Sequence, residues 1–399
     1  MEQARAETGE VGDRPAGREG TPLAPDAGAG APASAAADVG TGSGTLRMAT
    51  EASAAPVERR SARGTRRWLR RVAIALGVVL VLALGVAWLV FGRFSSRLER
   101  VEPTAGTLFR WPYYLYVPAE AEALAAAGGR LHLLVLPNNT GRADDDFGVH
   151  ERAAWMRAWR ERELAGDLGV AALVPVFPRP AWDWRVYTHA LDRDCLTTDV
   201  EGLARLDLQL VAMIDDARKA LAKRGWTVGE RVLLKGFSAN GMFADRFTAL
   251  HPERVLAAAV GSPGGWPIAP LAVHESVVLR YPAGVADVEE LVGLPFDAEA
   301  YAKVPVMVFM GEADANDSLD FGDGWDEEDR ELVELVFGAT PIERWEDAVA
   351  IRKAAGAKAT FRLYPGVGHE VTEEMEGEVE RFLAEALEGG HGTGSAESR

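Results

Sequence analysis

Residues 233–241 read LLKGFSANG. An apolar run ends at Gly236 and a helix-like segment begins just after Ser238, which predicts a strand, a sharp turn and a helix. In that context the serine projects from the top of a sheet, and the next backbone N–H lies near the start of a helix. Gly236 and Ser238 fit a G-x-S-x-G pattern, whereas Asn240 stands where the second glycine belongs. A G-x-S match alone is weak, so the prediction depends on partners elsewhere in the chain.

Length and charge limit the number of domains and the class of partner that the chain can have. The chain has 399 residues, enough for one large or two ordinary domains with tails, and a formal net charge of −17. Residues before Val72 carry eleven Arg against nine Asp or Glu, so the negative charge lies in the rest of the chain. An acidic folded part argues against nucleic acid as a partner, because phosphate contacts supply most of that affinity. The single cysteine, Cys195, excludes an intrachain disulfide.

The amino-terminal part divides into two segments. Residues 1–67 are rich in Ala, Gly, Pro, Glu and Thr, and we expect a disordered leader there. Residues 72–91 carry no charge and have the length that a helix needs to cross a bilayer, so we expect a transmembrane helix over 68–93. Arginine is more frequent on its amino side. This bias predicts a cytoplasmic amino terminus and a signal anchor in the cell membrane, with the large domain on the extracytoplasmic side.

Two alternatives to a signal anchor remain open. Residues 85–87 read GVA and would serve as a signal-peptidase site, which would release the domain. Residues 65–69 read TRRWL and loosely match a twin-arginine export signal. The long leader and the apolar residues that continue to Phe91 favour retention in the membrane.

The remainder is predicted to hold a linker over 94–106, one folded domain over 107–387 and a disordered tail over 388–399. Apolar, strand-like runs alternate with helical patterns such as the one at 203–221, which has apolar residues at three- and four-residue spacing. Such alternation predicts an α/β fold with a mostly parallel central sheet and helices on both faces. The predicted strands lie at 131–136, 170–177, 232–234, 255–260, 304–310 and 360–364.

Functional residues of such a sheet cluster at the carboxyl ends of its strands. Asp314 and Asp317 follow the strand at 304–310, and His369 follows the strand at 360–364. A serine needs a base to become a nucleophile, and the base needs a carboxylate that orients it and stabilises its charged form. Three separate loops that supply Ser, Asp and His in this order are far more specific than any one of them.

These residues carry a resemblance to a known superfamily. From about 107 to 386 the chain resembles the α/β hydrolases, which include esterases and lipases, through GFSANG at 236–241, GEAD at 311–314 and GVGH at 366–369. Within this superfamily it is similar to a bacterial group related to polyhydroxyalkanoate depolymerase-like and feruloyl-esterase-like proteins. The strings behind this second similarity are PNNTG at 137–141, YTHALDRD at 187–194 and NDS at 316–318.

The resemblance implies roles for individual residues. Ser238 would be the nucleophile, His369 the general base and Asp314 the orienting acid, with Asp317 as an alternative acid in the same loop. The oxyanion hole would combine the backbone N–H of Ala239 with one from the turn that holds Asn138 and Asn139. Many relatives have His-Gly at that turn, so the identity of the second donor stays open.

No cofactor or metal is expected. The acidic stretch 314–329 fails the calcium-loop pattern of an EF-hand, because Leu319 stands where glycine is needed. The leading hypothesis is a membrane-anchored serine hydrolase that cleaves small or polymeric carboxylic esters through an acyl-enzyme. Two alternatives are a non-catalytic binding domain at the cell envelope and a triad hydrolase that acts on peptides or polymers.

Overall fold

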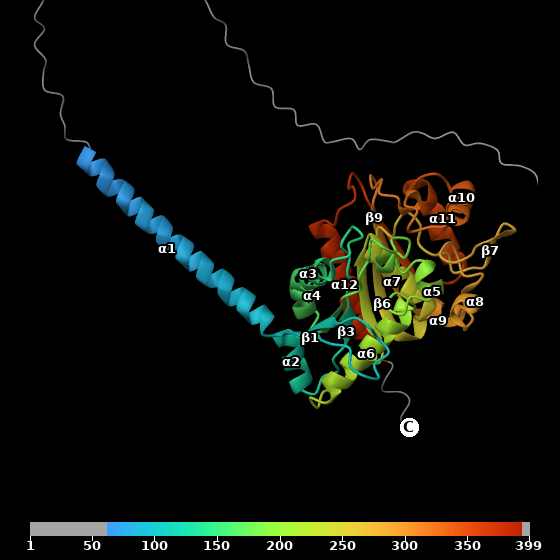
Figure 1. Cartoon of the computed structure of the whole chain (residues 1–399), viewed down its shortest axis with the longest axis horizontal. Helices are drawn as coiled ribbons and strands as arrows, with labels where there is room; N and C mark the ends of the chain where they lie inside the picture. Colours follow the sequence, from blue (N-terminus) through green and yellow to red (C-terminus); the bar gives the residue numbers. More distant parts are fainter. Residues whose placement is uncertain (1–61, 393–399) are drawn as a thin grey trace, which may run out of the picture. The chain divides into compact units, whose positions relative to one another are not determined.

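The computed structural model describes residues 62–392 (Figure 1). The chain divides into two compact units, residues 1–70 and 71–399, and the second holds the sheet. An eight-stranded sheet has the order β1-β2-β4-β3-β5-β6-β9-β10. Its strands are β1 (Leu98–Val101), β2 (Tyr113–Tyr116), β3 (Leu133–Val135), β4 (Ala171–Pro175), β5 (Val232–Phe237), β6 (Val255–Gly261), β9 (Val306–Gly311) and β10 (Ala359–Tyr364).

β2 runs antiparallel to both of its neighbours, and every pair from β4 to β10 is parallel. This order and these directions are those of the α/β-hydrolase fold. The central strands are almost entirely apolar because both faces of the sheet are covered. Side chains alternate between the two faces, so Leu234 belongs to one apolar cluster and its neighbour Leu233 to the other.

Helices cover both faces of the sheet, as the sequence predicts (Figure 1). One face packs on α6 (Leu206–Ala222) and α7 (Ala239–Leu250), and the other on α3 (Phe147–Arg160), α4 (Arg162–Asp167) and α12 (Glu373–Gly392). The remaining helices of the folded unit are α2 (Ala119–Ala126), α5 (Asp194–Thr197), α8 (Val288–Val292), α9 (Ala298–Lys303), α10 (Glu327–Phe337) and α11 (Pro341–Ala354).

Lys235 interrupts the apolar pattern of β5. It is buried, and its ammonium group lies 2.7 Å from a carboxylate oxygen of Glu161 and 2.5 Å from one of Glu376. A buried charge without partners is costly, so these carboxylates explain how a lysine is tolerated inside the sheet.

The connection at 262–303 contains the short hairpin strands β7 (Val273–His274) and β8 (Val277–Val278), then α8 and α9. It packs with α10 and α11 around an apolar cluster of its own. Within that cluster the rings of Trp266 and Phe337 stack at a centroid distance of 4.1 Å. The segment is thus anchored by a core rather than lying loose over the sheet.

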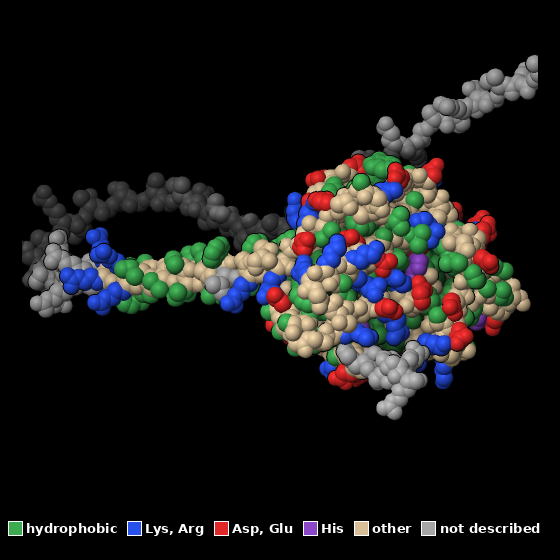
Figure 2. All heavy atoms as spheres, turned by 90° about the horizontal axis from the view of Figure 1, so that it is seen from below, with side chains coloured by type: hydrophobic (Ala, Val, Ile, Leu, Met, Phe, Trp, Pro, Cys, Tyr) green, Lys and Arg blue, Asp and Glu red, His purple; other side chains and the backbone are tan. Residues whose placement is uncertain are grey.

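The apolar segment forms α1 (Ala62–Ser95). The part Arg66–Ser95 has a mean hydropathy of 2.8 and is long and apolar enough to cross a membrane, by length and composition. Figure 2 shows apolar side chains along this helix and basic ones at its start. Such an all-round apolar surface suits lipid better than water. Near the end of the helix, Phe94 is buried, with its ring edge-on to Trp155 and Trp159 of α3.

The segment boundaries differ from those expected. Residues 98–101 of the expected linker form β1, because they pair with β2 and extend the sheet by one edge strand. Residues 62–67 of the expected leader and 94–95 of the expected linker are helical in α1, and residues 388–392 of the expected tail continue α12. The predicted disorder of 1–61 and of 393–399 concerns residues that lie outside the described part of the chain.

Candidate active site

The turn between β5 and α7 holds Ser238 in a strained conformation. Its φ of 63° and ψ of −131° are values that residues with a side chain rarely adopt. The Ser238 N–H donates to the carbonyl of Gly261 (2.9 Å), and the Ser238 carbonyl accepts from the N–H of Met242 (3.0 Å). These hydrogen bonds keep Ser238 in its strained conformation. A strained serine on a strand-to-helix turn is the geometry of a nucleophile elbow.

At two positions of this elbow, neighbouring backbone atoms lie so close that only glycine fits. A Cβ atom at Gly236 would lie 1.9 Å from the carbonyl oxygen of Asn240, and one at Gly241 would lie 2.3 Å from that of Gly261. The backbone therefore excludes any side chain at these two positions. Asn240 itself is buried, and its side chain fits because it points toward Pro137.

The loops after β9 and β10 bring Asp314 and His369 together. These strands are parallel neighbours with Gly311 opposite Tyr364, so both loops leave the same edge of the sheet. The Nδ1 atom of His369 lies 2.9 Å from Oδ2 and 3.1 Å from Oδ1 of Asp314. The imidazole ring also packs on Phe237, the residue before Ser238, at a centroid distance of 4.9 Å.

Asp314 is suited to hold a negative charge in this pair. Burial of its carboxyl group opposes ionisation, but hydrogen bonds from His369 and from the N–H of Asn316 outweigh it, so the pKa of Asp314 is lowered. Among the residues that the structure describes, the side-chain hydrogen bonds of His369 go to Asp314 and none reaches Ser238.

Asp317, the alternative acid, faces another partner. Its two carboxylate oxygens lie 3.1 Å and 2.6 Å from the terminal nitrogens of Arg344 on α11. It also accepts the N–H of Leu319 at the start of a short 3-10 helix, Ser318–Asp320. The geometry therefore favours Asp314 over Asp317 as the partner of His369.

The turn after β3 is held mainly by side-chain amides. Asn138 is buried, and its amide donates to the carbonyl of Phe177 (2.8 Å) and accepts from the N–H of Phe177 (3.1 Å). Asn139 accepts the N–H of Gly141 (2.9 Å). Both side chains thus help to hold the loop, Asn138 through both ends of its amide and Asn139 through its oxygen. Ala239 is the first residue of α7, where N–H groups have no acceptor within the helix.

His189 lies behind this turn as a structural residue. Its Nε2 atom is 2.9 Å from the carbonyl oxygen of Phe177, and its ring packs edge-on against His150. Burial lowers the pKa of His189 to about 3, so the ring is neutral. These contacts place His189 in a polar network.

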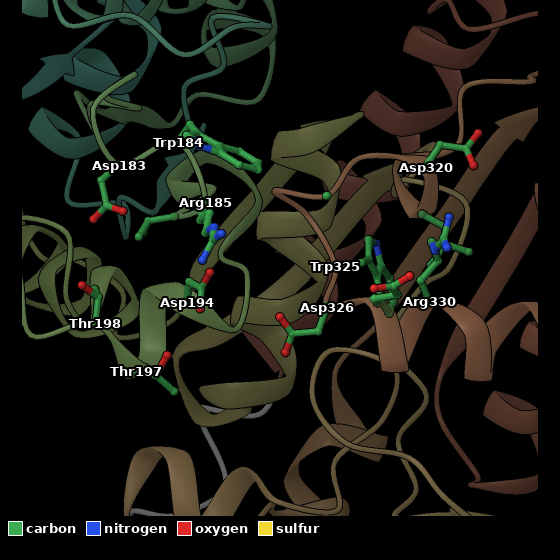
Figure 3. A pocket seen from close by; sticks show the side chains of 14 residues that line it. Asp183, Trp184, Arg185, Asp194, Thr197, Thr198, Asp320, Trp325, Asp326 and Arg330 are labelled. Atoms are coloured by element: carbon green, nitrogen blue, oxygen red, sulfur yellow. The ribbon is translucent and has the colours of Figure 1, made fainter. Parts of the chain in front are cut away.

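A cleft of about 700 Å³ is lined by fourteen residues, which do not include Ser238, Asp314 or His369 (Figure 3). Its walls come from residues 183–198 on one side and 319–330 on the other. Tyr187, next to the first wall, packs on Ala239 and Met242 of α7, and Ser318, next to the second, lies 3.3 Å from the sulfur of Met242. The two segments that line the cleft thus contact the first turn of α7 through residues next to the lining.

Acidic and aromatic side chains dominate the lining of this cleft. Burial and the nearby carboxylates of Asp326 and Asp183 raise the pKa of Asp194. Five carboxylates line the cleft against two guanidinium groups: Asp183, Asp194, Asp320, Asp326 and Glu327 against Arg185 and Arg330, with the indoles of Trp184 and Trp325. Among the described residues, no group of His, Cys, Asp or Glu is arranged to hold a metal ion.

Comparison with known proteins finds similarity in structure. No family model matches the sequence, and no curated protein does. A poly(aspartic acid) hydrolase from Sphingomonas sp. KT-1 is 19% identical over 71% of this chain and 97% of its own, with a TM-score of 0.47. A poly(3-hydroxybutyrate) depolymerase from Bordetella parapertussis is 17% identical over 73% and 90%, with a TM-score of 0.45. An S-formylglutathione hydrolase from Agrobacterium tumefaciens is 16% identical over 73% and 92%, with a TM-score of 0.37.

Proposed function

We propose that this chain, which has the α/β-hydrolase fold, is a serine hydrolase that cleaves carboxylic esters. One observation carries the proposal: the imidazole of His369, which is hydrogen-bonded to Asp314, packs on Phe237, the residue that precedes the strained Ser238 in the chain. Strain of this kind costs about 1–3 kcal/mol and persists where function needs it.

The proposed reaction has two steps. The Oγ atom of Ser238 attacks the ester carbonyl while His369 takes its proton, and Asp314 stabilises the imidazolium that forms. The N–H of Ala239 and a backbone N–H of the turn at 138–140 hold the negative charge on the carbonyl oxygen. His369 then protonates the departing alcohol and activates a water molecule, which releases the acid from Ser238. The same sequence of steps would cleave an activated peptide or a polymer.

The cleft between residues 183–198 and 319–330 is the proposed entry for the substrate. Its excess of carboxylates repels acyl or alcohol groups with negative charge and attracts those with positive charge. Its two indoles provide apolar surface for the uncharged part of the molecule and for contact with cations. We propose that neutral or cationic esters enter more readily than anionic ones.

The place of action is also a proposal. α1 would anchor the enzyme, because its apolar segment matches the thickness of a bilayer and is exposed along its length. Seven arginines precede the apolar run closely, at 59, 60, 63, 66, 67, 70 and 71. This bias would keep the amino terminus in the cytoplasm and the folded domain on the extracytoplasmic side.

A labelling experiment tests the proposed chemistry. A fluorophosphonate probe should react with the full-length protein at Ser238, as located by peptide mass spectrometry, because such probes trap an activated serine. Ser238→Ala should abolish both labelling and ester hydrolysis, while His369→Ala should reduce both by several orders of magnitude. A folded protein that stays unlabelled, or a Ser238→Ala variant with full esterase activity, would contradict the proposal.

A further inference from the structure

The order in which the strands are added to the sheet reverses between β3 and β5. From β3 the chain continues through α3 and α4 to β4 on one side, and from β5 through α7 to β6 on the other. Loops that leave the two strands therefore diverge, and open α/β sheets bind ligands in the crevice that forms at such a point. The β3–β5 ladder pairs Leu134 with Leu233 and Val135 with Leu234, so it ends before Pro137 and Phe237.

The side chain of Asn240 bridges the end of β5 and the segment that follows β3. Its Oδ1 accepts the N–H of Phe237 at 2.6 Å, and its Nδ2 donates to the carbonyl of Pro137 at 2.7 Å. The orientation of the amide is unambiguous, because an N–H can only donate and a carbonyl can only accept. With 4% of its surface exposed, Asn240 is shielded from water that would otherwise compete for both groups.

The two backbone groups that Asn240 joins stand next to the two halves of the proposed oxyanion hole. Phe237 is followed by Ser238 and by the N–H of Ala239. Pro137 is followed by the turn at 138–140, whose far side is fixed to Phe177 by the side chain of Asn138. One amide thus links this turn to the elbow on the side of the nucleophile.

We propose that Asn240 is a positioning residue that holds the two donors of the oxyanion hole at a fixed separation. This inference rests on the proposed function. Donors stabilise the developing charge only when they lie about 2.7–3.1 Å from the oxygen. A misplacement of about 1 Å can cost a factor of 100 in rate. Glycine, which the G-x-S-x-G pattern has at this position, offers no side chain for this purpose.

The test replaces the amide by a carboxylate of the same shape. Asn240→Asp keeps the acceptor for Phe237 but loses the donor to Pro137. In the full-length protein in detergent, we expect kcat for a p-nitrophenyl ester to fall by about 10- to 100-fold while KM changes by less than about threefold. Affinity for a trifluoromethyl ketone, which forms a charged tetrahedral adduct, should fall by a similar factor. Asn240→Gly removes the amide without adding charge and should show the same losses.

Gln209→Glu is the matched control. Gln209 is also a buried amide: it accepts the N–H of Arg110 (3.0 Å) and donates to the carbonyls of Gly202 (3.3 Å) and Ala204 (3.0 Å). None of these residues belongs to the proposed site, so this variant should have a lower Tm and an unchanged kcat.

The outcomes separate this inference from the proposed function. If wild type is labelled at Ser238 but both Asn240 variants keep kcat within twofold and lose only Tm, Asn240 is structural and the inference is overturned. If either variant folds and shows the loss in kcat and in ketone affinity, the inference stands. If wild type is neither labelled nor active, the proposed function and the inference fall together.

Discussion

Asp314 and Asp317 lie three residues apart in one loop and are both buried, yet their partners differ in kind. Asp314 meets the imidazole of His369, which is partly exposed and can gain and lose a proton. Asp317 meets the guanidinium of Arg344, which is buried and permanently charged. The first pair can take part in proton transfer, whereas the second can only hold the loop in place. The loop after β9 therefore carries both Asp314, which pairs with an imidazole, and Asp317, whose ion pair holds the loop in place.

The largest expected effect comes from Asp314→Asn. An asparagine keeps the shape of the side chain but cannot stabilise an imidazolium, and it allows the wrong tautomer of His369. In triads of this type such a change lowers kcat by about 10⁴-fold, and we expect a loss of that order here. Steady-state hydrolysis of a p-nitrophenyl ester measures it, with circular dichroism to show that the variant is folded.

Asp317→Asn is the counterpart in the same loop. If it lowers kcat as much as Asp314→Asn does, the assignment of the two aspartates is wrong. If Asp314→Asn leaves kcat within about tenfold of wild type, Asp314 does not act in a triad.

The second effect concerns stability. Removal of one partner from a buried ion pair leaves the other charge uncompensated, so Asp317→Asn should lower the free energy of unfolding by about 3–5 kcal/mol. Activity per folded molecule should stay within about threefold of wild type. Urea unfolding of the full-length protein, followed by tryptophan fluorescence, gives the first quantity, and a burst titration of active sites normalises the second.

Arg344→Met provides the reciprocal change. It should also destabilise the protein, while the double variant Asp317→Asn/Arg344→Met should recover part of the loss, because no buried charge is then left alone. Single variants as stable as wild type would mean that this pair does not support the loop.

The contrast between the two aspartates also shows where inference from sequence stops. The order of Ser238, Asp314 and His369 could be predicted, because each follows an apolar run and the ends of parallel strands meet at one edge. The choice between Asp314 and Asp317 could not, because it depends on Arg344, a residue of a later helix with no pattern that links it to this loop.

Two other features, at Asn240 and at residues 98–101, could not be predicted from the sequence for a similar reason. The sequence presents Asn240 only as a departure from glycine, since its partner Pro137 lies 103 positions away in the chain. The sequence predicts a linker where Leu98–Val101 form a strand, because the four residues LERV show no apolar run and their pairing with β2 depends on the sheet. In each case the deciding contact is distant in sequence, whereas the elbow and the strand ends are local patterns.

The smallest expected effect is the pH dependence of the Asp314 pair. The pKa of Asp314 is lowered in the folded protein, so the folded state favours the charged carboxylate. The stability that this provides is fully present above the unfolded pKa of about 3.9 and is lost as the pH falls through the lower, folded value. Urea unfolding of wild type and Asp314→Asn between pH 6 and pH 2 should show an advantage of wild type that shrinks only below about pH 4. An advantage that stays constant to pH 2, or grows as the pH falls, would mean that the His369 contact does not favour the charged carboxylate. Asp314 would then join Asp317 as a residue that supports the loop, and the distinction between the two pairs would disappear.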